Sequence, residues 1–254
     1  MSLFDLTGKK AIVTGASSGL GVQFAKALAA QGADVAVLAR RMEKLEEVAK
    51  EIESLGVSCL PVKCDVLEKE DIYAAVKKVH EAFGRIDILV NNAGVAVNAP
   101  AESQSNEDWE RVIDTNLTSV YYMAREVGKI MIKQNYGRII NIGSIHSRVA
   151  MAGLGISGYC ASKGGVFMLT KDLANEWAKY GITVNAIGPS YFASEMTDEV
   201  LEDPGFKQLL QAYCPMGRVG NPGELDGALI YFASDSSSFT TGQLLNIDGG
   251  WTAI

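Results

Sequence analysis

Histidine is almost missing from this chain, which has two among its 254 residues, His80 and His146. The scarcity matters for segment 15–19, because its Gly-x-Ser-x-Gly pattern, with Ser17 at the centre, is also that of a hydrolase nucleophile. Such a hydrolase needs a histidine base that follows its acidic partner in the chain. We expect His80 on a charged helical surface and His146 at the border of a pocket or in an irregular loop. A serine hydrolase using Ser17 is therefore a remote alternative.

Long apolar runs and an excess of positive charge are also missing. No apolar stretch reaches the ~18–20 residues that span a bilayer, and residues 1–5 lack the charged and apolar regions of a signal peptide. The 23 basic and 30 acidic residues give a net charge of −7, and no basic stripe is interleaved with aromatics. We expect no membrane segment, no nucleic-acid partner and a cytoplasmic location.

Cysteine is scarce as well, and its positions are Cys59, Cys64, Cys160 and Cys214. Their spacing does not match that of a metal site, so we expect no bound metal and interpret the four as reduced, packed thiols. With 48% hydrophobic residues, the chain can bury one large core without cross-links.

Short apolar runs alternate regularly with helical segments along the chain. The strand-like runs are 10–13, 35–38, 58–63, 86–91, 137–142, 183–187 and 244–247. This alternation predicts a doubly wound α/β fold of the Rossmann type, a parallel sheet of about seven strands with helices on both faces. No linker or repeat interrupts it, so we expect one domain over residues 1–254, with a substrate loop at about 189–216.

A glycine-rich segment follows the first strand-like run. Residues 14–21 read Thr-Gly-Ala-Ser-Ser-Gly-Leu-Gly, and helical periodicity follows at 22–31. Glycines between a strand and a helix let backbone N–H groups approach a pyrophosphate where a Cβ would collide. The segment is a variant of the dinucleotide-binding fingerprint and predicts a nucleotide site.

A second group of residues carries the candidate chemistry. Tyr159 and Lys163 are four apart in a helical segment, and residues at that spacing share one helix face. We expect the ammonium of Lys163 to lower the pKa of the Tyr159 phenol from its usual ~10 toward neutrality, which suits a group that moves a proton. Ser144 follows the apolar run 137–142 and is placed to hold a carbonyl or hydroxyl oxygen during that transfer.

Together these residues resemble the short-chain dehydrogenase/reductase family over nearly the whole chain. The matching segments, in order, are 14–21, 65–66, 91–94, Asn116, Ser144, Tyr159, Lys163, 185–189 and 247–250. By this resemblance Ser144 orients the substrate oxygen and Tyr159 is the acid and base. Lys163 lowers the pKa of Tyr159 and binds the nicotinamide ribose, and Asn116 helps to hold a water in a proton relay.

The resemblance also implies the residues that bind a nicotinamide cofactor. They are Gly15, Ser17, Ser18, Gly19, Leu20, Gly21, Arg40, Arg41, Asp65, Val66, Asn92, Ala93, Gly94, Tyr159, Lys163, Pro189, Ser190, Phe192 and Ser194. Ser190 stands where the family usually has glycine, and its Cβ restricts φ, so we expect a differently shaped turn. Ser194 replaces a common threonine and keeps the hydroxyl. The slightly long, glycine-rich connection from Ser144 to Tyr159 is expected at the mouth of the substrate pocket.

Two arginines indicate which cofactor is preferred. The run 35–38 continues into Ala39, Arg40 and Arg41, without the acidic residue that holds the ribose 2′-hydroxyl of NAD. A nearby arginine accommodates the 2′-phosphate of NADP instead. We favour NADP(H), with NAD(H) as the alternative. The other role open to the two arginines is to begin the charged helix at 42–55.

The substrate is inferred from the resemblance alone. Residues 191–197 and 214–220 look most like gluconate 5-dehydrogenase-like members of the family. This implies reversible hydride transfer between NADP(H) and a ketone or secondary alcohol, with a sugar acid or polyol as substrate. A hydroxysteroid dehydrogenase, a 3-oxoacyl thioester reductase and a catalytically silent nucleotide-binding protein are alternatives. By analogy we expect a homotetramer or homodimer that packs through helices near 108–134 and 158–180.

Overall fold

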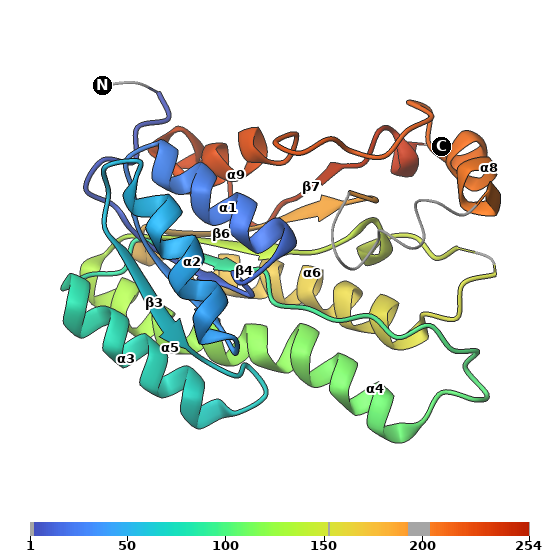
Figure 1. Cartoon of the computed structure of the whole chain (residues 1–254), viewed down its shortest axis with the longest axis horizontal. Helices are drawn as coiled ribbons and strands as arrows, with labels where there is room; N and C mark the ends of the chain where they lie inside the picture. The colour runs from blue at the N-terminus through green and yellow to red at the C-terminus, as the bar shows by residue number, and fades with distance from the viewer. Residues whose placement is uncertain (1–2, 152, 193–203, 254) are drawn as a thin grey trace.

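One parallel sheet of seven strands lies at the centre of the described chain (Figure 1). The computed structural model describes residues 3–151, 153–192 and 204–253. The strands are β1 (Lys10–Thr14), β2 (Asp34–Ala39), β3 (Cys59–Lys63), β4 (Ile88–Asn91), β5 (Gly137–Ile142), β6 (Ile182–Pro189) and β7 (Leu244–Ile247). Their order is β3-β2-β1-β4-β5-β6-β7, and every neighbouring pair is parallel. The predicted doubly wound parallel sheet is confirmed.

Successive residues of each strand point to opposite faces of the sheet. In β1, Ala11 and Val13 belong to one hydrophobic core and Ile12 to the other. Helices cover both faces, so the strand interiors are buried on both sides. This is why the strands read as continuous apolar runs in the sequence.

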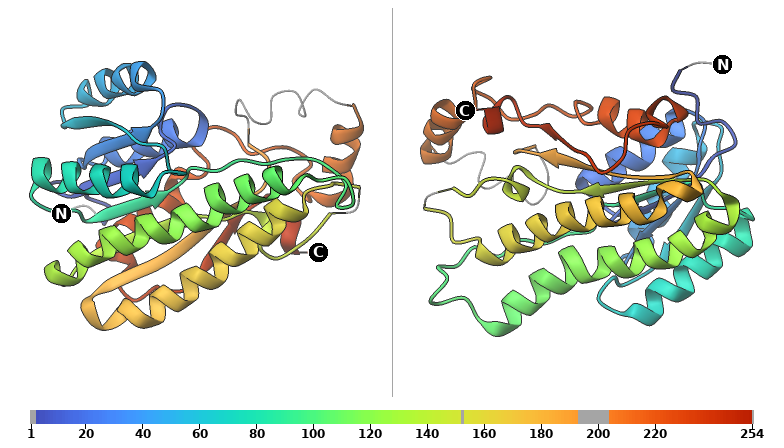
Figure 2. Two further views of the ribbon diagram at one scale, coloured as in Figure 1. Left: turned by 90° about the horizontal axis from the view of Figure 1, so that it is seen from below. Right: turned by 180° about the vertical axis from the view of Figure 1, so that it is seen from behind.

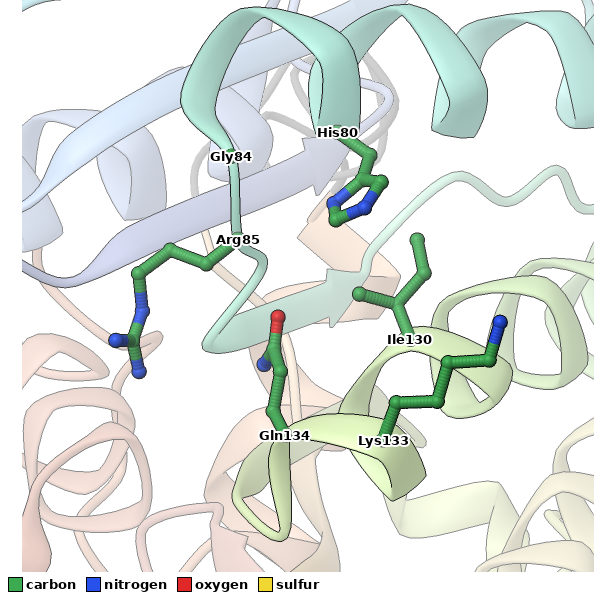
Figure 3. A pocket seen from close by; sticks show the side chains of 6 residues that line it. All are labelled: His80, Gly84, Arg85, Ile130, Lys133 and Gln134. Carbon is green, nitrogen blue, oxygen red and sulfur yellow. The ribbon is translucent and has the colours of Figure 1, made fainter.

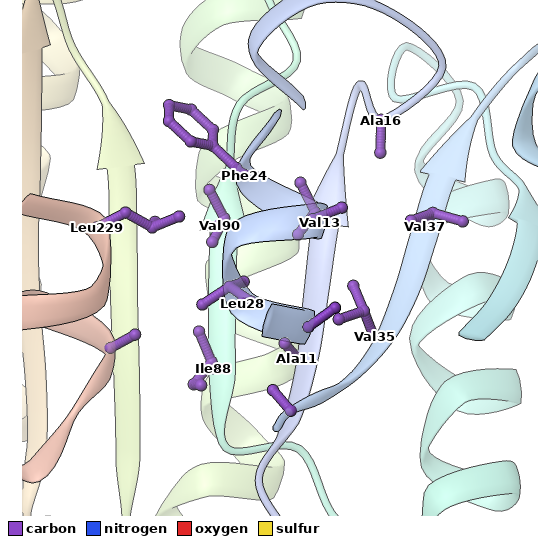
Figure 4. Close-up of a cluster of buried hydrophobic side chains, with 14 of the residues drawn as sticks. Ala11, Val13, Ala16, Phe24, Leu28, Val35, Val37, Ile88, Val90 and Leu229 are labelled. Atoms are coloured by element: carbon purple, nitrogen blue, oxygen red, sulfur yellow. The ribbon is translucent and has the colours of Figure 1, made fainter. Parts of the chain in front are cut away.

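The first face of the sheet is covered by α1 (Gly19–Ala30), α2 (Met42–Glu53) and α9 (Asp226–Ala233). Figure 4 shows Phe24 and Leu28 of α1 in front of the strands β1 and β4, with Leu229 of α9 to one side. All three are fully buried. Each such side chain contributes about 1.5–3 kcal/mol to folding.

The opposite face is covered by α3 (Lys69–Phe83), α5 (Ser119–Gln134) and α6 (Ser157–Trp177). The long helices α5 and α6 run side by side under the sheet (Figure 2). Their close approach depends on Gly128 of α5, because a Cβ there would lie 2.8 Å from the ring of Trp177 on α6. α6 is thereby held against β5 and β6, whose ends carry part of the candidate site.

The predicted helix near 108–134 is interrupted. It consists of α4 (Asn106–Ile113), a π-helical turn η1 (Asp114–Thr118) and α5. Ser105 caps α4, and its Oγ accepts a 3.0 Å hydrogen bond from the N–H of Asp108. The extra residue of a π turn rotates the following side chains, and such turns are frequent at functional sites.

A third hydrophobic cluster lies above the carboxyl edge of the sheet. Phe206 and Leu210 of α8 (Pro204–Tyr213) pack there with Ile145 and with Trp251 of the 3-10 turn η5 (Trp251–Ala253). Within the described ranges, no helix combines the length and apolar character needed to cross a membrane.

Candidate active site

The carboxyl ends of β1, β4, β5 and β6 meet at one edge of the sheet, and the direction of winding reverses between β1 and β4. Ligands of open α/β sheets bind outside such a switch point. The glycine-rich turn, the segment 92–94, Ser144 and Ser190 follow these four strand ends. The two predicted halves of the site are therefore neighbours.

The turn after β1 lets a ligand come close to its backbone. Gly15 and Gly19 have φ of +66° and +55°, which residues with a Cβ rarely adopt. A Cβ on Gly21 would overlap the carbonyl oxygen of Gly15. The side-chain amide of Asn92 donates a 2.9 Å hydrogen bond to the carbonyl oxygen of Thr14 and holds the turn against the end of β4. The N-terminus of α1 adds free N–H groups and the positive end of its dipole.

Thr14 also ties this turn to the segment after β4. Its Oγ1 accepts hydrogen bonds from the backbone N–H groups of Asn92, at 3.0 Å, and Ala93, at 3.1 Å. A Cβ on the next residue, Gly94, would lie 3.7 Å from Nζ of Lys163. The segment 92–94 thus connects the glycine-rich turn with the polar side chains deeper in the site.

Arg41 lies beside the glycine-rich turn. Its Nη2 donates hydrogen bonds to Oγ of Ser17, at 3.2 Å, and Oγ of Ser18, at 3.1 Å. β2 ends at Ala39, so no acidic residue stands at the strand end, and Arg40 is exposed next to it. Arg41, which directly precedes α2, thus reaches the predicted nucleotide site.

Asp65 and Val66 follow β3, the strand beside β2. The N–H of Cys64 donates a 2.9 Å hydrogen bond to the carbonyl oxygen of Ala39, so the two strand ends stay together. Oδ1 of Asp65 accepts a 3.1 Å hydrogen bond from the N–H of Leu67, which turns the chain toward α3. Both residues thus lie on the β2 side of the site.

Asn116 is fully buried in the π turn η1. Its Nδ2 donates to the carbonyl oxygen of Val95, at 2.8 Å, and to Oγ of Ser162, at 3.1 Å, while its Oδ1 accepts from the N–H of Val95. Ser162 in turn donates a 2.7 Å hydrogen bond to the carbonyl oxygen of Tyr159. Sequence reasoning missed Ser162, whose only signal is its place between Tyr159 and Lys163.

Ser144 is 5% exposed and begins the short 3-10 helix η2 (Ile145–Ser147). Its Oγ accepts a 3.1 Å hydrogen bond from the N–H of His146, and its own N–H donates a 3.2 Å bond to Oγ of Ser147. This reciprocal capping fixes the hydroxyl at the end of β5. Because Oγ accepts from the backbone, its proton is available to donate.

The predicted lowering of the Tyr159 pKa by Lys163 is wrong for the protein by itself. Burial raises the pKa of Tyr159, and a hydrogen bond with Ser144 offsets this only in part. Nζ of Lys163 lies 5.6 Å from the ring centroid of Tyr159 and donates a 2.7 Å hydrogen bond to the carbonyl oxygen of Ile142 instead. Burial of the phenol therefore sets the direction of its pKa shift.

Lys163 is itself buried at the floor of the site. It is 5% exposed, and burial lowers its pKa from 10.5 to about 8. At pH 7 the amine is still protonated. A positive charge therefore stands close to the backbone of Gly94, between the glycine-rich turn and Tyr159.

The segment after β6 tolerates Ser190. Its N–H donates a 3.3 Å hydrogen bond to the carbonyl oxygen of Ile247, which joins the turn after Pro189 to the end of β7. Asn135 is the only described non-glycine residue with a positive φ, so Ser190 carries no left-handed strain. The ring of Phe192 fills the space that a Cβ on Gly220 would need. Ser194 lies outside the described residues.

A separate pocket of about 390 Å³ lies at the opposite edge of the sheet, where α3 and α5 end (Figure 3). Its lining residues are His80, Gly84, Arg85, Ile130, Lys133 and Gln134. His80 is half-buried there rather than on an open surface, which corrects the expectation for this residue. None of the predicted site residues lines this pocket, and no group of metal-ligating side chains occurs in the part of the chain that the structure describes.

Known proteins are similar to this chain over nearly its whole length. A family model described as enoyl-(acyl carrier protein) reductase matches residues 15–252. A gluconate 5-dehydrogenase of Gluconobacter oxydans is 39% identical over 250 residues, which are 98% of this chain and 97% of that protein. The crystal structure of a gluconate 5-dehydrogenase from Burkholderia cenocepacia, in complex with NADP and tartrate, is 38% identical with a TM-score of 0.95, covering 99% of this chain and 98% of that one.

A short-chain type dehydrogenase/reductase from Mycobacterium marinum gives a TM-score of 0.94 at 38% identity, again over 99% of this chain and 98% of that one. These matches extend over the glycine-rich turn and the group Ser144, Tyr159 and Lys163 alike. The chain belongs to the short-chain dehydrogenase/reductase family.

Proposed function

We propose that this protein is an NADP(H)-dependent oxidoreductase that transfers hydride reversibly between the nicotinamide and a ketone or secondary alcohol of a sugar acid or polyol. The observation that carries the proposal is the junction at residues 92–94, which joins the glycine-rich turn to the group of Ser144, Tyr159 and Lys163. The names of the Gluconobacter and Burkholderia relatives support the substrate class, and the NADP in the Burkholderia structure supports the cofactor.

The residues present fit such a dinucleotide. The positive φ of Gly15 and Gly19 and the close packing of Gly21 against Gly15 shape a turn whose backbone N–H groups can bind a diphosphate. Arg41 supplies a guanidinium at the end of β2, where a 2′-phosphate is recognised. The bound nicotinamide supplies or accepts the hydride. We assign Arg40, Asp65, Val66, Pro189, Ser190 and Phe192 to the rim of the same site.

Tyr159 transfers the proton, and Ser144 holds the substrate oxygen. Ser144 donates a hydrogen bond from its hydroxyl to the substrate oxygen and so holds that oxygen in place. The pKa of Tyr159 is raised by burial, so the phenol is protonated at neutral pH and ready to donate a proton to a ketone oxygen during reduction. Lys163 binds ribose hydroxyls, and its ammonium lies 5.6 Å from the ring centroid of Tyr159. Asn116 fixes the segment at Val95 and helps to hold a relay water.

The test is oxidation of NADPH and NADH, in parallel, with keto sugar acids, ketosteroids and 3-oxoacyl thioesters. We expect turnover with NADPH and a keto sugar acid such as 5-keto-D-gluconate. Preference for a 3-oxoacyl thioester would favour the activity in the description of the matching family model. Preference for NADH would contradict the role of Arg41.

We further propose that residues 1–254 form one domain that acts in the cytoplasm as a homotetramer. The large exposed apolar side chains Tyr121 on α5 and Met168 on α6, 41% and 63% exposed, support an interface through these helices. Light scattering after size-exclusion chromatography tests this. A mass near four times 27.2 kDa is expected, and a monomer would contradict it.

A further inference from the structure

His146 is a buried titratable side chain that the proposed proton transfer does not use. It is 7% exposed and lies in η2, two residues after Ser144. Its ring packs edge-on against Tyr159, with ring centroids 6.1 Å apart and an angle of 79° between the planes. The imidazole therefore forms a wall of the space where Ser144 and Tyr159 meet.

The surroundings of the ring decide which nitrogen carries the proton. Nδ1 lies 3.0 Å from the carbonyl oxygen of Val149, which can only accept, so Nδ1 is the donor. Burial lowers the pKa of His146, and the bond to Val149 offsets this only in part, so the ring is neutral near pH 7. Nε2 is then an unprotonated hydrogen-bond acceptor.

Nε2 is available for a ligand. Among the described residues, Nδ1 is the ring nitrogen of His146 that has a hydrogen-bond partner, and Nε2 has none. A hydroxyl of a bound ligand can donate a hydrogen bond to this nitrogen. The loop that holds the ring is fixed by the hydrogen bond from the N–H of His146 to Oγ of Ser144.

We propose that His146 is a specificity-determining residue that accepts a hydrogen bond from a substrate hydroxyl on the carbon next to the reacting carbonyl. The inference rests on the proposed oxidoreductase function. The reacting oxygen is held by Ser144 and Tyr159. The backbone N–H of His146 bonds to Ser144 and its ring packs against Tyr159, so the imidazole is a neighbour of the substrate carbon next to the reacting carbonyl. Because Nε2 can accept but not donate, it selects a hydroxyl over a methyl, an ether or a second carbonyl.

This assignment separates the candidate substrate classes. Sugar acids and polyols carry a hydroxyl beside the carbonyl that is reduced, whereas the keto group of a 3-oxoacyl thioester has only methylene neighbours. The acceptor at His146 therefore favours the first class and gains nothing from the second. One hydrogen bond of this kind corresponds to about a tenfold preference.

Two substitutions of His146 distinguish the role of Nε2 as an acceptor from the structural role of the bond between Nδ1 and Val149. Asn at this position places an amide near Nδ1, so His146→Asn keeps a donor for the carbonyl oxygen of Val149 and loses the acceptor at Nε2. His146→Gln reaches the position of Nε2 with an amide oxygen and restores the acceptor. His80→Asn, at the only other histidine of the chain and in the pocket at the opposite edge, is the matched control.

The experiment measures kcat/KM with NADPH for 1-hydroxy-2-butanone and 2-butanone, which differ by one hydroxyl beside the carbonyl, and for 5-keto-D-gluconate. We expect the wild type to prefer the hydroxyketone by about tenfold. His146→Asn should lower that ratio toward one, while His146→Gln and His80→Asn should keep most of it.

Equal losses on both butanones in His146→Asn would overturn the proposal, because they would show a purely structural role. A wild type without preference for the hydroxyketone would also overturn it. Failure of the proposed substrate class is a different result: 5-keto-D-gluconate would not be reduced, while the ratio of the two butanones still followed the acceptor.

Discussion

Nζ of Lys163 donates a 2.7 Å hydrogen bond to the carbonyl oxygen of Ile142, the last residue of β5. This bond fastens α6, which carries Tyr159, to the strand that leads into Ser144. One buried ammonium therefore positions the two side chains that hold and protonate the substrate oxygen. Burying this charged ammonium also costs free energy, and that cost lowers the pKa of Lys163.

Lys163→Met should stabilise the protein without nucleotide at pH 7 while abolishing turnover. Methionine fills a similar volume and removes the cost of burying a charge, at the loss of one hydrogen bond. Urea denaturation of wild type and variant measures the free energy of unfolding. A variant clearly less stable than wild type at pH 7 would show that the bond to Ile142 outweighs the burial of the charge.

The stability difference between wild type and Lys163→Met should also depend on pH. The pKa of Lys163 is about 8 in the folded protein against 10.5 as its ordinary value, so between these values the unfolded chain binds more protons. Wild-type stability therefore rises relative to the variant from pH 8 to 10.5, by up to about 3 kcal/mol, and is constant below pH 8. A difference that stayed flat over this range would contradict the lowered pKa.

Gly21→Ala should lower both stability and cofactor affinity. The new Cβ would overlap the carbonyl oxygen of Gly15 and press on the side chain of Asn92, so the turn has to move. We expect a loss of about 1–3 kcal/mol in the free energy of unfolding and at least ~10-fold weaker NADPH binding.

Gly227→Ala is the matched control, because nothing lies within 4 Å of a Cβ at that position of α9. It should stabilise the protein by about 0.5–1 kcal/mol through helix propensity. Thermal melts and fluorescence titration with NADPH give both quantities. If the two alanine variants had the same thermal stability and the same affinity for NADPH, the glycine-rich turn would not be closely packed.

Arg41→Ala should weaken NADPH binding about tenfold and leave NADH binding within about twofold, because a charge-assisted hydrogen bond to the 2′-phosphate is lost. Arg40→Asp should act in the same direction by repulsion. Lys50→Ala removes an exposed charge elsewhere on α2 and serves as the control. Equal losses for the two cofactors in Arg41→Ala would contradict the NADP(H) assignment.

The sheet could be predicted closely because its strands are buried on both faces. The run 137–142 is β5 to the residue, since a short apolar β-branched run between turn residues has few other interpretations. Helix positions were harder. The π turn at Asn116 depends on hydrogen bonds with Val95, and local periodicity contains no signal for a contact 21 residues away in the chain.

The electrostatics of the site could not be predicted from spacing. The i, i+4 relation correctly placed Lys163 near Tyr159, but it does not say which acceptor the ammonium chooses. The ammonium of Lys163 donates its hydrogen bond to the carbonyl oxygen of Ile142. Burial raises the pKa of the Tyr159 phenol. The contact of His146 with Tyr159 likewise depends on how η2 folds back over α6.

The central claim is that Tyr159 moves the proton, and Tyr159→Phe tests it most directly. The variant keeps the ring against His146 and removes only the hydroxyl. The measurement is kcat for reduction of 5-keto-D-gluconate, or of the best ketone found, together with the Kd for NADPH. The account predicts a fall of about 10³-fold in kcat with the Kd within about threefold. A variant that binds NADPH and retains wild-type kcat would contradict it.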